Sequence, residues 1–316
     1  MNPVRSKKPE VSADLYVTSQ TSNGMKIVTH DGYFHTDDLF AVASFLLQYP
    51  EALITRTRDE VIIRDADTAV DVGQIYDPTT LRFDHHQKEG AGKRENGIPY
   101  ASFGLVWKHL GEELAGGKCE AEIIEERMVM AIDALDNGVE ICHGVFEGVS
   151  SYTLTDYLDG FNDGAKILED FDKKFFEVLP FVRELLKKEI GRAKIVAKDW
   201  EEVEKIYRES ADKNIIVLPL NTHWKKIIVP TEARFVVFPR PNGYWSARAV
   251  PQKLNSFESK ILFPLSWAGL GEKELPTVSG VSDATFCHRD RFIANARSKE
   301  GAIKLCQIAL GGPTAK

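Results

Sequence analysis

The pattern of apolar positions changes period repeatedly between residues 25 and 135 of this chain. Short runs rich in β-branched residues predict strands at 25–30, 53–55 and 68–72. Apolar positions at helical spacing predict helices at 37–48, 60–63, 102–110 and 120–135, with Thr36 as the N-cap of the first. Strands that alternate with helices predict an α/β domain built on a doubly wound parallel sheet.

The pattern after residue 162 is different. An apolar stripe predicts long helices over 163–208, interrupted at Pro180. Further strands are predicted at 214–218, 235–238 and 244–249, the last two as a hairpin, and a helix at 298–310. We therefore expect a flexible tail (1–24), a first α/β domain (25–162), a helical connector (163–208) and a smaller α/β domain (209–316).

Composition adds few constraints. A chain of 316 residues with 43% hydrophobic residues can bury a large core, and a net charge of -7 gives no global basic field. Four scattered cysteines without a Cys-x-x-Cys pair favour reduced thiols in an intracellular compartment. No apolar run approaches the roughly 20 residues of a membrane span, so we expect a soluble protein without a membrane partner. Residues 1–24 mix basic and acidic side chains, which favours a flexible terminus over a mitochondrial presequence.

Two histidines and two aspartates stand in the turn between the first predicted strand and the first predicted helix. They are His30, His35, Asp37 and Asp38. In an α/β sheet this turn lies at the carboxyl end of a strand, where ligands bind. Acids in a first helical turn also offset the helix dipole, but two histidines so close to Asp37 favour metal ligation.

A second group of metal-binding residue types follows the strand predicted at 68–72. Asp71 ends that apolar run, and Asp84-His85-His86 comes shortly after it. Four of the eight histidines fall in these two motifs, a concentration that a metal site would produce. Asp65 and Asp67 precede the strand, and we interpret them as turn residues.

A third acidic segment ends the helix predicted at 120–135. An acid at a helix C-terminus is electrostatically unfavourable unless a cation compensates it. Asp133 and Asp136 share a helical face, so either could be a ligand, and Asp136 is preferred because it lies nearer the break in the helix.

The glycine-rich loop 87–99 directly follows the Asp-His-His tripeptide. Its cations are Lys88, Lys93 and Arg94. Two interpretations stay open: a mobile connection, or a set of contacts to a phosphate chain.

In this order, the motifs resemble those of a known superfamily. His30-x4-His35-x-Asp37, Asp71, Asp84-His85-His86 and the Asp133/Asp136 segment resemble the four motifs of the DHH phosphoesterases. Residues 28–139 are similar to the Myg family of DHH-like exonucleases, and the similarity extends to Trp245-Ser246-Ala247-Arg248 and Phe286-Cys287-His288-Arg289. The resemblance implies a DHH-like catalytic domain in a 3'-5' exonuclease acting on single-stranded RNA. It also implies a location in the nucleus or nucleolus and in mitochondria, with the cytoplasm as a further possibility.

The resemblance further implies a two-metal site. Two cations about 3.5–4 Å apart can provide a hydroxide at neutral pH and neutralise the oxygens of a phosphodiester. Carried over motif by motif, His30, His35 and Asp71 would hold one cation. Asp37, Asp71, His85 and Asp136 (or Asp133) would hold the other, with Asp71 bridging the two. Mixed imidazole and carboxylate donors suit manganese best.

Catalytic roles follow from the same carry-over. Asp71 and His85 would act through the cations, and His86 would contact the scissile phosphate or donate a proton to the leaving oxygen. This chain departs from the superfamily pattern by having His35 where an aspartate is usual and one extra residue after His30. The division of ligands between the two cations therefore stays open.

The second domain would hold the substrate. The glycine run that usually stands beside a histidine in the superfamily is absent, and its nearest counterpart is the segment 279–291. Arg248, His288 and Arg289 are therefore the candidate phosphate contacts. Trp245 and Trp267 could stack bases, but tryptophans on strands are more often core residues.

Two other function classes remain besides the RNA exonuclease, and none of the three calls for an organic cofactor. One is a small-phosphate hydrolase, such as a pyrophosphatase or an oligonucleotide or cyclic-dinucleotide phosphodiesterase, which the same metal centre would serve. The other is a non-enzymatic metal-dependent binding protein, against which the intact ligand set argues.

Overall fold

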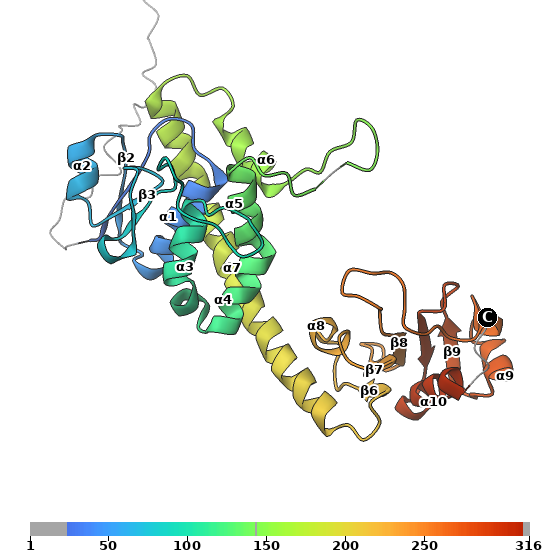
Figure 1. Ribbon diagram of the computed structural model, residues 1–316. Helices are drawn as coiled ribbons and strands as arrows, with labels where there is room; N and C mark the ends of the chain where they lie inside the picture. Colours follow the sequence, from blue (N-terminus) through green and yellow to red (C-terminus); the bar gives the residue numbers. More distant parts are fainter. Residues whose placement is uncertain (1–23, 143, 312–316) are drawn as a thin grey trace, which may run out of the picture. The chain divides into compact units, whose positions relative to one another are not determined.

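The computed structural model describes residues 24–142 and 144–311, and these form two compact units. The first unit is made of residues 24–109 and 129–184, the second of residues 110–128 and 185–311. Both contain a five-stranded mixed sheet with helices packed on it, so the α/β prediction is confirmed at this level (Figure 1).

The sheet of the first unit has the strand order β2-β1-β3-β5-β4. Its strands are β1 Lys26–Thr29, β2 Leu53–Arg56, β3 Thr68–Val70, β4 Tyr76–Asp77 and β5 Arg82–Phe83. β1 pairs in parallel with β2 and β3, and β3 with β5, as expected from the alternation with helices. β4 runs antiparallel to β5, because the two strands are joined by a tight turn, and this edge makes the sheet mixed.

Helix α1 (Thr36–Gln48) is the central helix of the first unit. It packs on β1 and β3 and also contacts α5 (Met130–Asp136) and α6 (Leu154–Asp159), so every residue from Thr36 to Leu46 is buried. The N-cap is His35, not Thr36 as predicted, because the backbone N–H of His35 donates to the Asp38 carboxylate (3.1 Å). Both aspartates of the first turn, Asp37 and Asp38, are buried.

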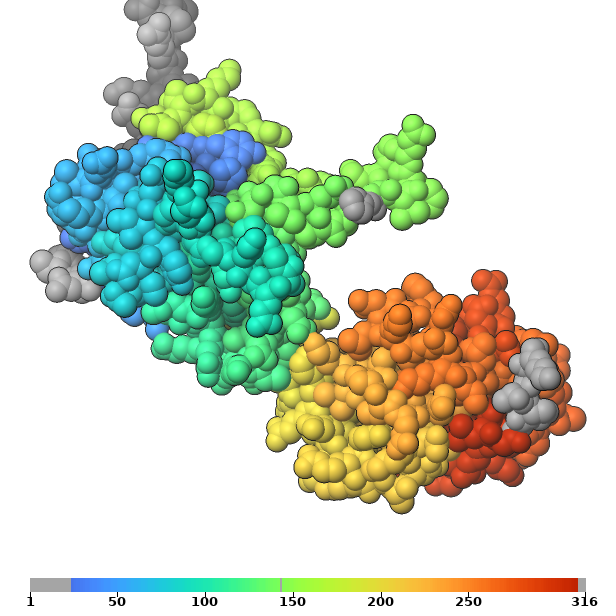
Figure 2. Space-filling view, viewed as in Figure 1, coloured from blue at the N-terminus to red at the C-terminus, as the bar shows by residue number. Residues whose placement is uncertain are grey.

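Three further helices lie between α1 and α5 in the chain. α2 (Glu60–Asp65) belongs to the first unit, α3 (Ser102–Ala115) crosses the boundary between the two units, and α4 (Lys118–Ile124) belongs to the second unit. The helix predicted at 120–135 is not uniform, because the π-helical turn η3 (Glu125–Val129) separates α4 from α5. Residues 144–153 contain no helix or strand and project from the first unit (Figure 2).

Helix α7 (Leu168–Glu209) runs for 42 residues through both units. The predicted interruption at Pro180 was wrong, because the helix continues through the proline. Pro180 itself is exposed, so its ring lies outside the buried stripe of the helix. The buried stripe continues on both sides of it with Phe175, Val178, Leu179, Val182 and Leu186, whose burial holds the two halves in one helix.

The second unit has a sheet with the order β6-β7-β8-β10-β9. Its strands are β6 Ile215–Val217, β7 Phe235–Pro239, β8 Trp245–Ala249, β9 Ala284–Cys287 and β10 Ile293–Ala296. β7 and β8 form the predicted antiparallel hairpin, and α10 (Lys299–Gly311) packs on β7, β8 and β10. Trp267 is buried and stacks on Phe263, which confirms that it is a core residue. In the described part of the chain, no helix is both long and apolar enough to cross a membrane.

Candidate metal centre

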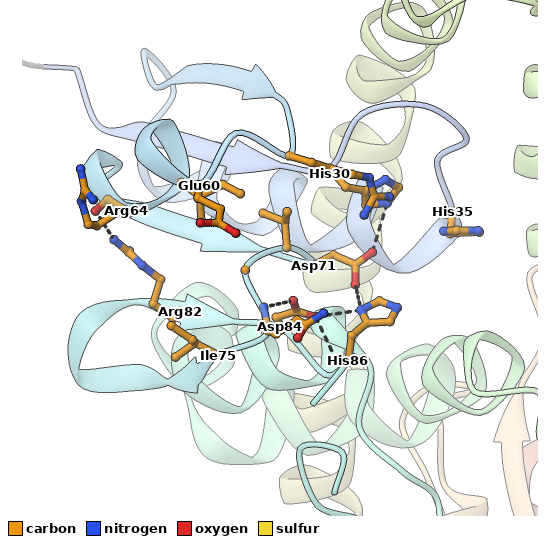
Figure 3. Close-up of a pocket in the computed structure, with 14 residues that line it drawn as sticks. His30, His35, Glu60, Arg64, Asp71, Ile75, Arg82, Asp84 and His86 are labelled. Atoms are coloured by element: carbon orange, nitrogen blue, oxygen red, sulfur yellow. Dashed lines mark hydrogen bonds and ion pairs between the residues drawn. The ribbon is translucent and has the colours of Figure 1, made fainter. Parts of the chain in front are cut away.

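Histidines and aspartates from four segments meet at one edge of the first sheet. Figure 3 labels five of them: His30, His35, Asp71, Asp84 and His86. His30 follows β1, Asp71 follows β3, and Asp84, His85 and His86 follow β5. Asp37 and Asp38 lie in the first turn of α1, and Asp136 is the last residue of α5. Because the parallel strands β1, β3 and β5 all end at this edge, residues distant in the sequence come together there.

Asp71 lies at the centre of the group. Its backbone has φ 55, which turns the chain sharply at the end of the strand. One carboxylate oxygen is 3.4 Å from His85 Nε2 and 3.4 Å from His86 Nδ1, and it accepts a hydrogen bond from Ser102 Oγ (3.0 Å). The other oxygen is 3.2 Å from His30 Nε2. Burial acts to raise the pKa of Asp71, but the histidines hold it well below its usual range.

Asp37 and Asp136 form the acidic side of the site. Asp37 is fully buried, and burial together with the nearby charges of Asp71 and Asp136 raises its pKa well above the usual value. Burial also raises the pKa of Asp136, whose carboxylate lies 3.2 Å from His85 Nε2. Without a cation, therefore, the charged forms of both carboxyl groups are disfavoured.

Three sets of residues in the described chain bring their ligand atoms within 4.8 Å of one another. The sets are His30, His35 and Asp71; Asp71, His85 and His86; and His35, Asp37 and Asp136. The first set coincides with one of the two predicted ligand sets. The predicted second set is divided between the other two, which include His86 and a second use of His35.

The unsatisfied atoms of the site fit a cation. Asp37 Oδ1, Asp38 Oδ2 and His85 Nε2 are buried and have no hydrogen-bond partner among the described residues. Buried polar atoms are almost always bonded, so a group of them beside other metal-ligand types needs an explanation. Carboxylate oxygens and imidazole nitrogens are suitable ligands for manganese or zinc.

Asp38, which the sequence analysis names beside Asp37 but assigns to neither cation, is also part of the site. Its Oδ2 lies 3.1 Å from His30 Nε2, an ion-pair distance without hydrogen-bond geometry. Although burial opposes it, the attraction of Asp38 and Asp71 raises the pKa of His30 to about 10. His30 Nδ1 is 2.9 Å from the carbonyl oxygen of Asp31, which orients the ring.

Asp84 holds His86, another function that the sequence alone did not reveal. The buried Asp84 carboxylate lies 2.8 Å from His86 Nδ1 and accepts from the backbone N–H groups of His86 (3.0 Å) and Gln74 (2.6 Å). Burial acts to raise the pKa of Asp84, but these hydrogen bonds lower it. The hydrogen bond that His86 donates to Asp84 in turn raises the pKa of His86. The His86 side chain remains 57% exposed, so it can meet a substrate.

Asp133 occupies a different environment from Asp136. It is fully buried, and its carboxylate accepts from Arg94 Nη2 (2.8 Å) and from the backbone N–H of Gly104 (3.0 Å). Burial raises the pKa of Asp133 to about 7, although Arg94 acts to lower it. Asp133 belongs to none of the three candidate metal sets.

The three cations of the loop 87–99 differ in exposure. Arg94 lies over the ring of Tyr100 (4.1 Å) with its side chain only 7% exposed, whereas Lys88 and Lys93 are exposed.

Two cavities open onto the candidate metal centre. The larger, 640 Å³, is lined by His30, Asp71, Asp84 and His86 and extends past Arg58 and Arg64 (Figure 3). The other, 430 Å³, is lined by His35, Asp71, His85 and Asp136 and reaches Asp159. The candidate ligands are thus accessible to small molecules and ions.

The three predicted substrate residues all lie in the second unit. Arg248 is in β8, and its guanidinium lies 5.8 Å from the ring centre of Phe292. His288 packs against the same ring (4.5 Å), and Arg289 is exposed beside Asp290. A cavity of 530 Å³ includes Arg248 but neither His288 nor Arg289.

Known proteins of one family are similar to this chain over almost its whole length. The sequence profile of an uncharacterised protein family (UPF0160), called MYG1 exonuclease, matches residues 26–310. A MYG1 protein of Caenorhabditis elegans is 30% identical over 324 residues, covering 90% of this chain and 94% of the relative. A MYG1 protein of Dictyostelium discoideum is 27% identical over 315 residues, covering 88% and 94%. The MYG1 exonuclease of Homo sapiens is 28% identical over 332 residues, covering 90% and 85%.

Proposed function

Because this chain belongs to the MYG1 family (UPF0160), we propose that it is a metal-dependent nuclease of the DHH phosphoesterase type. More specifically, we propose a 3'-5' exonuclease that acts on single-stranded RNA. The observation that carries the proposal is the environment of Asp71, whose two carboxylate oxygens face three histidines beside buried atoms that lack partners. The name of the human relative, an exonuclease, supports the choice of reaction.

Two cations would share Asp71 as a ligand. His30, His35 and Asp71, which form one of the three sets, would hold one cation. Asp37, Asp71, His85 and Asp136, which are divided between the other two sets, would hold the other. Two divalent cations, with manganese the best match to these donors, would supply a nucleophilic hydroxide at neutral pH and neutralise charge on the phosphate. Ser102 donates to Asp71 and so fixes the orientation of the carboxylate that both sets share.

His86 would act on the substrate rather than on the cations. Its ring is exposed at the cavity and is oriented by Asp84, which also favours the protonated imidazolium. A positioned imidazolium can donate its proton to the oxygen that leaves when the phosphodiester bond is hydrolysed. Asp84 then serves as the group that positions the acid.

A small-phosphate hydrolase is the second candidate. The cavities of 640 Å³ and 430 Å³ at the centre are within the range of about 300–1,000 Å³ that is typical of small-molecule sites. A pyrophosphate or a dinucleotide would fit such a space. A location in the nucleus or nucleolus and in mitochondria belongs to the proposal only through the family resemblance.

One assay separates these functions. The protein is supplied with manganese and given labelled single-stranded RNA, single-stranded DNA, pyrophosphate and a dinucleotide, and we expect RNA to be shortened from its 3' end.

Asp71→Ala should abolish hydrolysis while the fold survives, because this carboxylate is shared by two candidate ligand sets. Asp65→Ala is the matched control, since Asp65 is exposed at the end of α2. Near-wild-type hydrolysis by Asp71→Ala with intact metal content would refute the two-metal assignment.

A further inference from the structure

The second unit contains a cavity that shares no residue with the candidate metal centre. Its volume is 530 Å³. It is lined by the helical run that ends in η3, by α7, by the segment 221–226 and by Arg248 of β8. All of its lining residues belong to the second unit.

Positive charge gathers around this cavity although the whole chain has a net charge of -7. The lining cations are Arg127, Arg192, Lys225, Lys226 and Arg248, against one carboxylate, Glu126. Two of these cations are already neutralised, because Arg127 pairs with Glu189 (3.2 Å) and Lys226 with Glu126 (2.8 Å).

The other three cations have no carboxylate partner in the ion pairs of the described residues. Arg192 is exposed on α7, and Lys225 is exposed in α8 (Lys225–Ile228). The guanidinium of Arg248 lies 5.8 Å from the ring centre of Phe292. Uncompensated cations around one concave surface create a local positive potential, and this attracts anions.

Two neutral groups of the lining add hydrogen-bonding and stacking capacity. The Thr222 hydroxyl is buried without a hydrogen-bond partner among the described residues, so it is available to a ligand. Trp200 of α7 is half-buried at the cavity, and Lys226 Nζ lies 5.7 Å from its ring centre. Guanidinium, ammonium and hydroxyl groups are the usual contacts to nucleic-acid phosphates, and aromatic rings stack on unpaired bases.

We propose that this cavity binds the phosphodiester backbone of single-stranded nucleic acid. Arg192, Lys225 and Arg248 bind phosphate oxygens, the Thr222 hydroxyl donates to another, and Trp200 offers a face to a base. A cavity of this volume with three separate cations and an indole is larger than a single phosphate requires. The inference deepens the proposed nuclease function and rests on it, since it adds a second contact region for the same substrate.

Binding can be measured independently of hydrolysis. The full-length Asp71→Ala protein, in excess chelator, is titrated against fluorescently labelled single-stranded RNA across a salt series, with anisotropy as the readout. Each phosphate contact in a single strand contributes about 0.7 to the slope of log affinity against log salt. Arg192→Ala and Lys225→Ala should therefore each reduce the slope by about 0.7, which over one decade of salt, from 1 M to 0.1 M, is a loss of about fivefold.

The control and the contrary outcomes are defined by the same titration. Lys205→Ala removes an exposed cation from α7 that does not line the cavity, and it should leave both affinity and slope unchanged. Equal affinities and slopes for all three variants would overturn the proposal. Competition by polyglutamate as effective as that by unlabelled RNA would also overturn it, because the cavity would then bind acidic chains in general. If the slopes change as expected but the manganese-loaded wild type hydrolyses nothing, the binding site stands and the nuclease proposal fails.

Discussion

Substitution of Asp133 and Asp136 by asparagine should produce opposite patterns, and this is the most direct test of the ligand assignment. The two residues are three positions apart on one helix, yet Asp133 faces Arg94 and Gly104 while Asp136 faces His85. Asparagine keeps the shape of the side chain and removes the charge. Each variant therefore reports on the environment of one carboxylate.

Asp133→Asn should lower stability and leave metal binding intact. The carboxylate receives two buried hydrogen bonds, but asparagine has a single acceptor oxygen, so one donor loses its partner. An unsatisfied buried donor costs about 1–3 kcal/mol. At about 2–4 °C per kcal/mol, the melting temperature should fall by roughly 2–12 °C.

Asp136→Asn should leave the metal-free protein as stable as the wild type and weaken its response to manganese, because it removes a ligand of one of the two proposed cations. Burial already disfavours the charge of Asp136, so removing that charge costs the metal-free fold little. In the wild type, manganese at a hundred times its dissociation constant adds about 2.7 kcal/mol, which raises the melting temperature by roughly 5–11 °C. Thermal melts of both variants, in chelator and in manganese, measure all four values. A lost manganese response in Asp133→Asn combined with a normal one in Asp136→Asn would refute the reasoning.

Three further predictions concern other residues of the first unit. His86→Ala should keep its metals but slow the hydrolysis of RNA by about 10²–10⁴-fold. Hydrolysis of a nitrophenyl phosphodiester should slow by less, since a good leaving group needs no proton. Metal analysis showing a missing ion would make His86 a ligand instead. Gly104→Ala should destabilise the fold by about 1–3 kcal/mol, because the added Cβ would lie 1.7 Å from Asp133 Oδ2. Gly191→Ala, on α7 with nothing within 4 Å, is its control in denaturant titrations, and equal midpoints would contradict the clash. Because the pKa of His30 is raised to about 10, this imidazole is protonated at neutral pH and must lose its proton to bind a cation. Metal affinity should therefore rise with pH up to about 10. Calorimetric heats should depend on the buffer in the wild type and depend on it less in His30→Gln, where Asp37 can still release a proton; buffer-independent heats in the wild type would contradict it.

The fold of the first unit could be read from periodicity where the elements are long or regular. The alternation of strands and helices predicted the parallel pairing of β1, β2 and β3. α6 escaped prediction because its six residues are too few to show a helical period. β10 escaped because its sequence, Ile-Ala-Asn-Ala, contains a single β-branched residue and so lacks the composition typical of a strand.

The site was predictable in part for a similar reason. Residues that follow a strand are recognisable in the sequence, and the ends of neighbouring parallel strands must meet, which brings His30 and Asp71 together. Contacts that depend on side-chain direction were not recognisable. Ser102 reaches Asp71 from 31 residues further along the chain, and Asp84 turns back onto its own neighbour His86.

The buried carboxylate oxygens without hydrogen-bond partners indicate where a cation would bind more precisely than the sequence motifs do. Among the buried aspartates, Asp84 accepts three hydrogen bonds and Asp133 accepts two, so neither has a need for a metal. Asp37 and Asp38 each keep one buried oxygen without a hydrogen-bond partner among the described residues. A buried carboxylate without compensation is costly, so it takes up a proton or meets a positive charge. The pKa values of Asp37 and His30 are raised because protons supply this compensation when no cation is bound. A cation held at the first turn of α1 would replace those protons.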